Sequence, residues 1–198
     1  MGVKRILFLI IISFLYFIGI WFTGKIYLAD RYYNQGLVME KGGRWLEAIP
    51  LYEKAISLDS KSVTFYESLG RLYLLRSWFP LEGEGFLLRA RDTVEEGLSL
   101  CPQNGDLWLL QGMILERFSE KEALSAYNKS ISFDPHNAFY HAVLSTFYLK
   151  RGREKEGIFE AKKAALCYNP SCVYDYLKKM GIDERTVGKI QQGRLNVQ

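Results

Sequence analysis

Histidines are the side chains of this chain that would most readily bind a metal or transfer a proton. The only two are His136, in the turn sequence Asp-Pro-His-Asn, and His141, five residues later. No cysteine or carboxylate stands near either of them at the spacing of a metal site. We therefore expect no bound metal.

The other candidate motifs do not indicate an enzyme. The carboxylate pairs Glu95–Glu96 and Asp183–Glu184 fall at the expected ends of solvated helices. The Gly-Glu-Gly of residues 83–85 follows no predicted strand, so we assign it to a loop rather than to a nucleotide-binding turn. No G-x-S-x-G, phosphate-loop or H-E-x-x-H motif occurs. We predict a protein without catalytic residues and without a cofactor.

The sequence allows two interpretations of the three cysteines. Cys167 and Cys172 flank Asn169-Pro170, and in an exported domain they would come within disulfide range. Alternatively, both of them and Cys101 are small buried residues at helix ends.

A membrane anchor is predicted at the N-terminus. The 19 residues from Ile6 to Gly24 carry no charge, and as a helix they span about 28 Å, close to the hydrocarbon thickness of a bilayer. Lys4 and Arg5 precede this segment, and aromatic residues crowd its second half. A cleaved signal peptide is the alternative, but the apolar run is longer than usual and no A-x-A site follows. We therefore expect residues 1–28 to be an uncleaved anchor.

Charge supports this division of the chain. The net charge is +4, of which residues 1–31 hold +3 and the rest only +1, so we expect no nucleic-acid partner. Basic residues flank the apolar segment on both sides and nearly balance. The short basic N-terminus favours a cytoplasmic N-terminus. We expect a single-pass protein of the bacterial inner membrane with its remaining residues in the periplasm.

The rest of the chain repeats itself. A small residue is followed at +4 by a second core position and at +7 by another small residue, in four segments whose starts are 42, 33 and 34 residues apart. Small residues Gly36, Gly70, Gly112 and Ser145 precede these segments, where they would let a partner helix approach closely. The four segments are Ala48-Tyr52-Ala55, Ala90-Val94-Gly97, Ala123-Tyr127-Ser130 and Gly157-Ala161-Ala164.

This pattern resembles the tetratricopeptide repeat (TPR), a 34-residue helix-turn-helix unit. The resemblance covers residues 29–171 and implies an all-α fold: an α-solenoid of about four units, at 29–62, 63–104, 105–137 and 138–171. Asn104, Asn137 and Ser171 stand where helix N-caps are expected. The second unit is eight residues too long, with an insertion at 77–85.

Two further elements complete the expected architecture. Cys172 to Met180 has Val173, Tyr176, Leu177 and Met180 on one face, so residues 172–198 supply a capping helix, a second short helix from Asp183 and a tail. Lys25 to Gln35 contains neither proline nor glycine, so we expect the membrane helix to continue into the first repeat helix.

The resemblance implies a protein-binding groove. In the family, the second, fifth, ninth and twelfth positions of each first helix line a concave surface. The lysine and asparagine clamp that grips a C-terminal carboxylate in some members is absent, because Tyr33, Leu37, Ser68, Asp106 and Leu110 occupy its places. The insertion adds an aromatic pair, which either packs on the array or contacts a partner. The expected protein-binding residues are Tyr33, Leu37, Glu67, Arg71, Trp78, Phe79, Leu109, Met113, Phe139 and Thr146.

Function is predicted from these surfaces. The leading hypothesis is a non-catalytic, membrane-anchored scaffold whose partners are protein subunits of a membrane or envelope complex, with the bilayer contacted through residues 6–24 and no small-molecule substrate. The alternatives are an assembly or chaperone-like factor that holds exported or membrane clients, and an accessory subunit of envelope polysaccharide machinery. The fold alone does not rank them.

Overall fold

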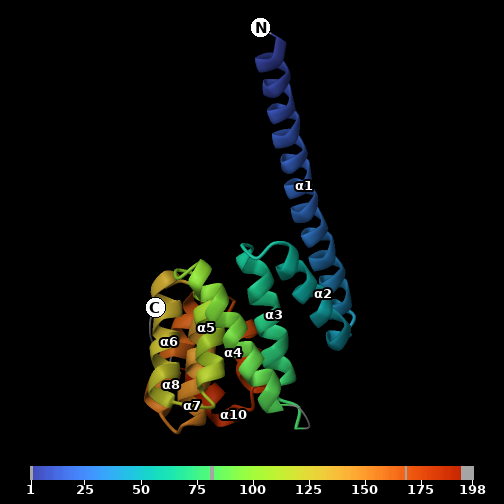
Figure 1. The fold of residues 1–198 in the computed structure, drawn as a ribbon. Helices are drawn as coiled ribbons and strands as arrows, with labels where there is room; N and C mark the ends of the chain where they lie inside the picture. The colour runs from blue at the N-terminus through green and yellow to red at the C-terminus, as the bar shows by residue number, and fades with distance from the viewer. Residues whose placement is uncertain (1, 81–82, 168, 193–198) are drawn as a thin grey trace. The chain divides into compact units, whose positions relative to one another are not determined.

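All regular structure in the described residues is α-helical. A computed structural model of the chain describes residues 2–80, 83–167 and 169–192, and these ranges contain no strand. The helices are α1 (Gly2–Lys41), α2 (Trp45–Leu58), α3 (Val63–Arg76), α4 (Gly83–Leu100), α5 (Gly105–Leu115), α6 (Glu120–Phe133), α7 (Ala138–Lys150), α8 (Glu154–Cys167), α9 (Pro170–Lys179) and α10 (Glu184–Gln192) (Figure 1). They fall into two compact units, each with two helical hairpins: the first unit ends at Cys101 and the second unit begins at Pro102.

Successive helices pair as antiparallel hairpins. In the first unit α1 pairs with α2 and α3 with α4, and in the second α5 pairs with α6 and α7 with α8. The predicted small residues lie where the helices meet: Gly112 faces the ring of Tyr127, and Ser145 donates a hydrogen bond of 2.8 Å to the carbonyl of Gly157. All twelve residues of the four predicted segments are buried, which confirms the repeat pattern.

Side-chain caps begin several of the helices. The amide oxygen of Asn104 accepts from the backbone N–H of Leu107 at 2.9 Å, and that of Asn137 accepts from Phe139 at 3.1 Å, as predicted. The prediction for Ser171 is wrong. Asn169 is the cap of α9, and it accepts from the Ser171 backbone N–H at 3.0 Å. Pro170 is the first helical residue, where its missing N–H and fixed φ suit a helix start.

The insertion is shorter than the sequence suggested. Because α4 begins at Gly83, residues 83–85 form its first turn rather than a loop, and α4 reaches 18 residues where α2, α6 and α8 have 14. Part of the extra length therefore extends a helix. Only residues 77–82 lie between α3 and α4, and 81–82 lie outside the described residues.

A helical cap closes the second unit. Val173 and Leu177 of α9 are buried, and Tyr176 and Met180 of the predicted face are half-buried. Val187 and Ile190 of α10 join them in a cluster with residues of α7 and α8. The helix α9 is followed by Gly181, whose φ of +82° is the left-handed conformation in which glycine commonly ends a helix.

Candidate protein-binding surfaces

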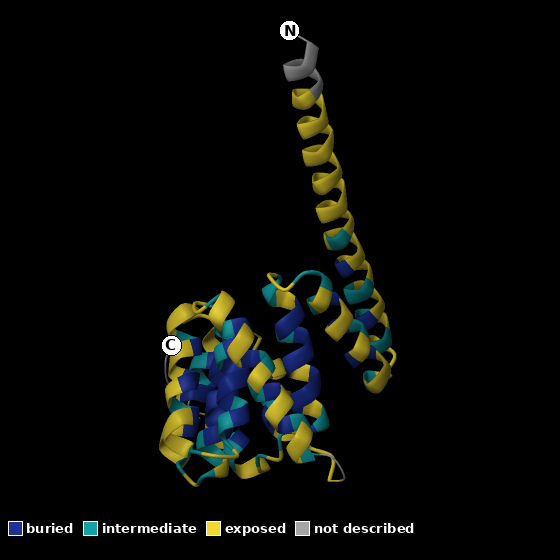
Figure 2. Ribbon diagram, viewed as in Figure 1, coloured by how far each residue is buried: buried dark blue, intermediate teal, exposed yellow. Residues whose placement is uncertain are grey.

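The first half of α1 is a long apolar helix with no partner in the structure. Its large side chains from Leu7 to Phe22 are exposed, as the outer part of the helix in Figure 2 shows. Among the described residues, α1 is the one helix long and apolar enough to cross a membrane, with a mean hydropathy of 2.3 in its most apolar window. Where the apolar segment of α1 ends, the Lys25 ammonium lies 4.1 Å from the centroid of the Trp21 ring.

The predicted groove residues of the first unit lie at or near its surface. Tyr33 is half-buried, its hydroxyl lies 3.1 Å from the Ser68 hydroxyl, and its ring packs against Phe65. Leu37 and Glu67 are half-buried as well, and Arg71 is exposed. These four residues come from the first helices α1 and α3, as the family pattern implies.

In each unit a tyrosine of the second helix of a hairpin donates to a glutamate at the end of the first helix. The Tyr52 hydroxyl donates to the Glu40 carboxylate at 2.7 Å, and Arg71 of the next hairpin donates to the same carboxylate at 3.0 Å. Burial, followed by the hydrogen bond to Glu40, raises the pKa of Tyr52 well above its ordinary value. In the first unit these polar groups therefore join two hairpins, with the tyrosine protonated.

The second unit repeats this contact with different residues. The Tyr127 hydroxyl donates to Glu116 at 2.5 Å, and the Arg151 guanidinium donates to Glu116 at 3.4 Å. Burial and the nearby Glu116 charge raise the pKa of Tyr127. Arg151 follows α7, whereas Arg71 lies within α3, so the two arginines reach the glutamate from different repeat positions. The tyrosine and glutamate are equivalent, but the arginine is not.

The predicted groove residues of the second unit are divided between core and surface. Leu109 is 3% exposed, and half-buried Met113 packs against the same core cluster. Thr146 is 4% exposed and donates to the carbonyl of Ala142 at 2.9 Å, on a face of α7 against which α9 packs. Phe139 is exposed, with its ring edge-on to Tyr176. Leu109 and Thr146 are therefore core residues here, and Phe139 presents the accessible surface.

The insertion carries two exposed aromatic residues, Trp78 and Phe79, which with half-buried Trp45 of α2 and Arg76 of α3 we define as the aromatic cluster. Trp78 is 58% and Phe79 is 44% exposed. Phe79 lies edge-on to Trp45, with ring centroids 6.4 Å apart, and the Arg76 guanidinium lies 4.7 Å from the Phe79 ring centroid. Phe79 is thus partly packed on its own hairpins, whereas Trp78 offers the larger accessible aromatic surface.

Sequence reasoning missed a buried ion pair. His141 Nδ1 lies 2.6 Å from the Glu160 carboxylate, and Nε2 lies 2.9 Å from the Pro135 carbonyl, which only accepts, so Nε2 donates. The hydrogen bond to Glu160 raises the pKa of His141 against the opposing effect of burial. Burial alone would raise the pKa of Glu160, but hydrogen bonds from His141 and Lys163 lower it. Glu160 lies 19 residues along the chain from His141, outside the spacing of a metal site.

The contact between His141 and Glu160 joins α7 to α8. His141 is 3% and Glu160 is 8% exposed. Within the described ranges, no three His, Cys, Asp or Glu side chains gather as a metal site would require. An open depression beside the pair is lined by Ile131, Pro135, His136, His141, Lys163, Leu166 and Cys167.

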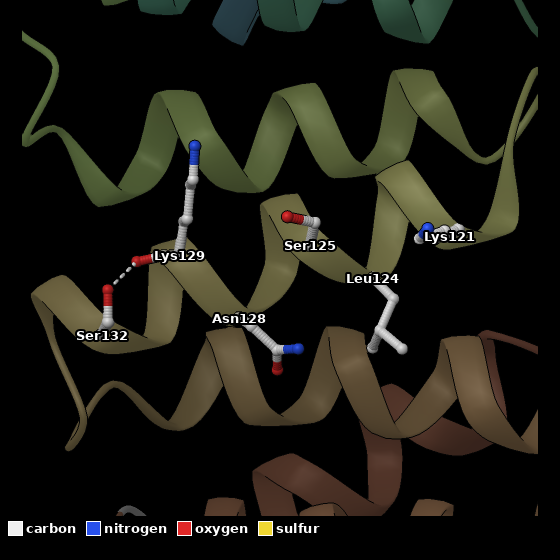
Figure 3. Close-up of a pocket in the computed structure, with 6 residues that line it drawn as sticks. All are labelled: Lys121, Leu124, Ser125, Asn128, Lys129 and Ser132. Carbon is white, nitrogen blue, oxygen red and sulfur yellow. Dashed lines mark hydrogen bonds between the residues drawn. The ribbon is translucent and has the colours of Figure 1, made fainter.

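A second depression lies on the outer side of α6. In Figure 3 the Lys129 side chain points toward α5, and Leu124 and Asn128 point the opposite way. The Lys129 ammonium lies 4.0 Å from the centroid of the Trp108 ring, and the Ser132 hydroxyl donates to the Lys129 carbonyl at 2.7 Å. The depression is lined by Lys121, Leu124, Ser125, Asn128, Lys129 and Ser132, none of which is acidic. This is a shallow basic surface without paired catalytic groups.

The three cysteines are free thiols in the structure. Cys101 is half-buried, but Cys167 and Cys172 are exposed. The interpretation of all three as small buried residues is therefore wrong for this last pair. Both thiols are open to reagents.

The helices and their contacts define an α-solenoid of helix-turn-helix repeats. No family model and no curated protein matches the chain in sequence. Solved structures do match its fold: a thermophilic TPR protein of Thermus thermophilus has 14% identity and a TM-score of 0.58, over 78% of this chain and 100% of that one. MamA of Desulfovibrio magneticus RS-1 has 16% identity and a TM-score of 0.58, over 70% and 75% of the two chains. YrrB, described as a TPR protein with an unusual peptide-binding site, has 18% identity and a TM-score of 0.52, over 81% and 90%. The chain has the TPR fold.

Proposed function

We propose that the chain is a non-catalytic TPR scaffold, anchored in a membrane by one helix, which binds other proteins of a membrane or envelope complex. One observation carries this proposal: the exposed apolar segment and the first repeat helix are parts of the same 40-residue helix, α1. Such a helix would combine a membrane span with an interaction repeat. Anchoring would raise the local concentration of the array near membrane partners.

The proposed division of the chain follows from this function. Residues 1–28 are the anchor, with residues 6–24 in the bilayer, residues 29–171 are the repeat array and residues 172–198 are the cap and tail. Lys4 and Arg5 favour a cytoplasmic N-terminus, which puts the array in the periplasm of a bacterium with the anchor in its inner membrane.

The exposed thiols allow this orientation to be tested. A thiol reagent that crosses the outer but not the inner membrane should label Cys167 and Cys172 in intact cells if the array is periplasmic. Labelling only after the inner membrane is opened would place the array in the cytoplasm. Release of the chain by alkaline carbonate would contradict the anchor itself.

The proposed partner-binding residues are those of the predicted set that the fold leaves accessible. Arg71, Trp78, Phe79 and Phe139 are exposed. Tyr33, Leu37, Glu67 and Met113 are half-buried on the first helices of their repeats. Aromatic and arginine side chains commonly dominate the binding free energy of protein interfaces. The peptide-binding site in the description of YrrB supports polypeptide as the ligand class.

No reaction is proposed for the chain. Three buried or half-buried polar contacts, Tyr52 with Glu40, Tyr127 with Glu116 and His141 with Glu160, join helices to each other. Each uses a titratable group that a catalytic site would need. The TPR fold supports the same conclusion, because TPR domains typically serve as protein-interaction modules.

Site-specific crosslinking in membranes tests the scaffold proposal. A photo-crosslinking residue at Trp78 should form an adduct with a defined protein in fixed stoichiometry. The matched control is Phe159, an aromatic residue of α8 with the same exposed fraction as Trp78, 58%. Many substoichiometric adducts at Trp78 would instead indicate a chaperone-like factor. Equal adducts at both positions would contradict a binding surface at the insertion.

A further inference from the structure

The anchor and the repeat array are joined without a flexible connection. The helix α1 is continuous from Gly2 to Lys41, and Gly24 lies inside it. Ala29 is the first residue of α1 that the array buries completely, against Ala55 and Phe65. Five residues separate Gly24 from Ala29, which is about 7.5 Å of helix. This is close to the thickness of one headgroup layer, about 6 Å.

The turn between α2 and α3 lies at the end of the first unit from which the apolar half of α1 extends (Figure 1). Because α2 runs antiparallel to α1, its last residues lie beside Ala29, and Leu58 packs against the Ala29 cluster. Residues 59–62 follow and lead into α3, at the end of the unit from which α1 extends (Figure 1). The Tyr66 hydroxyl donates to the Ser60 carbonyl at 3.2 Å, and the Asp59 carboxylate accepts from the Lys61 backbone N–H at 3.0 Å. Two hydrogen bonds therefore hold this turn in place.

We infer that the turn of residues 59–62 and the adjoining stretch of α1 lie against the lipid headgroups, so that the first unit sits on the bilayer surface rather than above it. The inference depends on the proposed membrane span. A span that ends near Gly24 leaves about 7.5 Å of helix, so Ala29, where the array begins, lies close to the outer edge of the headgroup layer. With an average membrane tilt of about 20°, a spanning helix gains no extra height.

The charged side chains at this end suit the headgroup layer, with Arg31 and Lys61 exposed and Lys25 half-buried. Lys25 and Arg31 of α1 and Lys61 of the turn would reach lipid phosphates, and Lys25 already lies over Trp21, an amphipathic ring suited to the interface. Asp30 and Asp59 at the same end nearly offset this positive charge. The contact therefore follows from the rigid helix rather than from net attraction, and it should be insensitive to salt.

This placement also sets the height of the aromatic cluster. The helix α3 leads from the turn to the insertion, and its 14 residues span about 21 Å. Trp78 and Phe79 therefore lie about 20 Å further from the bilayer than Ser60 does. A partner that binds the aromatic cluster would be held away from the headgroups.

Fluorescence quenching in lipid vesicles tests the inference on the full chain. With all three cysteines replaced by serine, a fluorophore is attached at Ser60→Cys or, as the matched control, at Lys41→Cys, 17 residues beyond Gly24 on α1 and about 26 Å further along it. The vesicles contain phosphatidylcholine with a nitroxide on its headgroup. The label at residue 60 should be quenched several-fold more strongly than the label at residue 41, at low and at high salt.

A flexible Gly-Ser segment inserted between Gly24 and Lys25 provides a second variant. It should abolish the difference between the two labels, while thermal unfolding shows that the array is unchanged. Equal quenching of both labels in the uninterrupted chain would overturn the inference, even though the chain stays in the vesicles. Release of the chain from the vesicles by alkaline carbonate would instead contradict the membrane span, and with it the proposed function.

Discussion

Replacement of Gly112 by alanine tests a close contact between α5 and α6 in the second unit. A Cβ atom on Gly112 would lie 2.6 Å from two ring atoms of Tyr127, closer than non-bonded carbon atoms approach. The ring is fully buried, packs against Phe147 and is fixed through its hydroxyl to Glu116. The two helices must therefore move apart to admit the methyl group.

The change in the free energy of unfolding of Gly112→Ala is the sum of two opposing effects. Overpacking of this kind costs about 1–3 kcal/mol, whereas alanine is favoured over glycine within a helix by about 1 kcal/mol. We expect a net loss of about 1 kcal/mol, which lowers the ratio of folded to unfolded forms about fivefold. Gly188→Ala is the matched control, because Gly188 lies inside α10 with nothing within 4 Å of an added Cβ. That variant should gain stability.

Hydrogen exchange of the full chain in detergent can measure both variants. Gly112→Ala should lower amide protection in α5 and α6 about fivefold, and Gly188→Ala should leave it unchanged or raise it. A gain in protection for Gly112→Ala, equal to that of the control, would refute the close approach of α5 to Tyr127. The sign of the effect is therefore the decisive result.

Three further predictions concern the ion pair, the tyrosine contact and the aromatic cluster. Because the pKa of His141 is raised above 6.5 in the folded state, the stability that it contributes is fully present below that pH and is lost as pH rises through the raised value. The free energy of unfolding should therefore fall as pH rises above about 6.5, and His141→Gln should flatten that slope, which urea titrations at each pH would measure. Tyr127→Phe, which leaves Glu116 without this donor, should lower the free energy of unfolding by about 1–2 kcal/mol, and an unchanged urea midpoint would contradict the role of the hydrogen bond. Trp78→Ala should weaken partner capture in pull-downs while thermal unfolding stays unchanged, and loss of thermal stability with intact capture would show that Trp78 is a packing residue.

The hairpin contacts were predictable because helix packing leaves a strict spacing in the sequence. Small residues seven positions apart, with a core residue four positions after the first, mark where two helices touch, and each of the twelve residues chosen in this way is buried. The N-caps Asn104 and Asn137 were predictable for a similar local reason. Ser171 was not, because Asn169 and Ser171 are both good caps and Pro170 decides between them by fitting the first helical position.

The buried ion pair was missed because its partners lie 19 residues apart on different helices. A usable signal was present. Ser145 of α7 contacts Gly157 of α8. His141 lies one turn before Ser145, and Glu160 lies one turn after Gly157, so the two side chains meet. Because hairpin helices run antiparallel, a single known contact sets the register of the others.

The candidate binding residues were only partly predictable. A repeat position identifies the face on which a side chain lies, but not whether another helix covers that face. The helix α9 packs on α7 and buries Ala142 and Thr146, and Leu109 enters the core cluster with Tyr127. Trp78 and Phe79 lie outside the repeat pattern, so their exposure required the structure.

The distance between two spin labels on α1 tests most directly whether one rigid helix fixes the array to the bilayer. Leu15 and Asn34 are both exposed, one in the apolar half and one in the repeat half. They are 19 residues apart, which is about 28 Å along a continuous helix. In lipid vesicles the account predicts a narrow distribution of distances near this value. A broad distribution, or one centred at a much shorter distance, would show a hinge between anchor and array and would contradict the account.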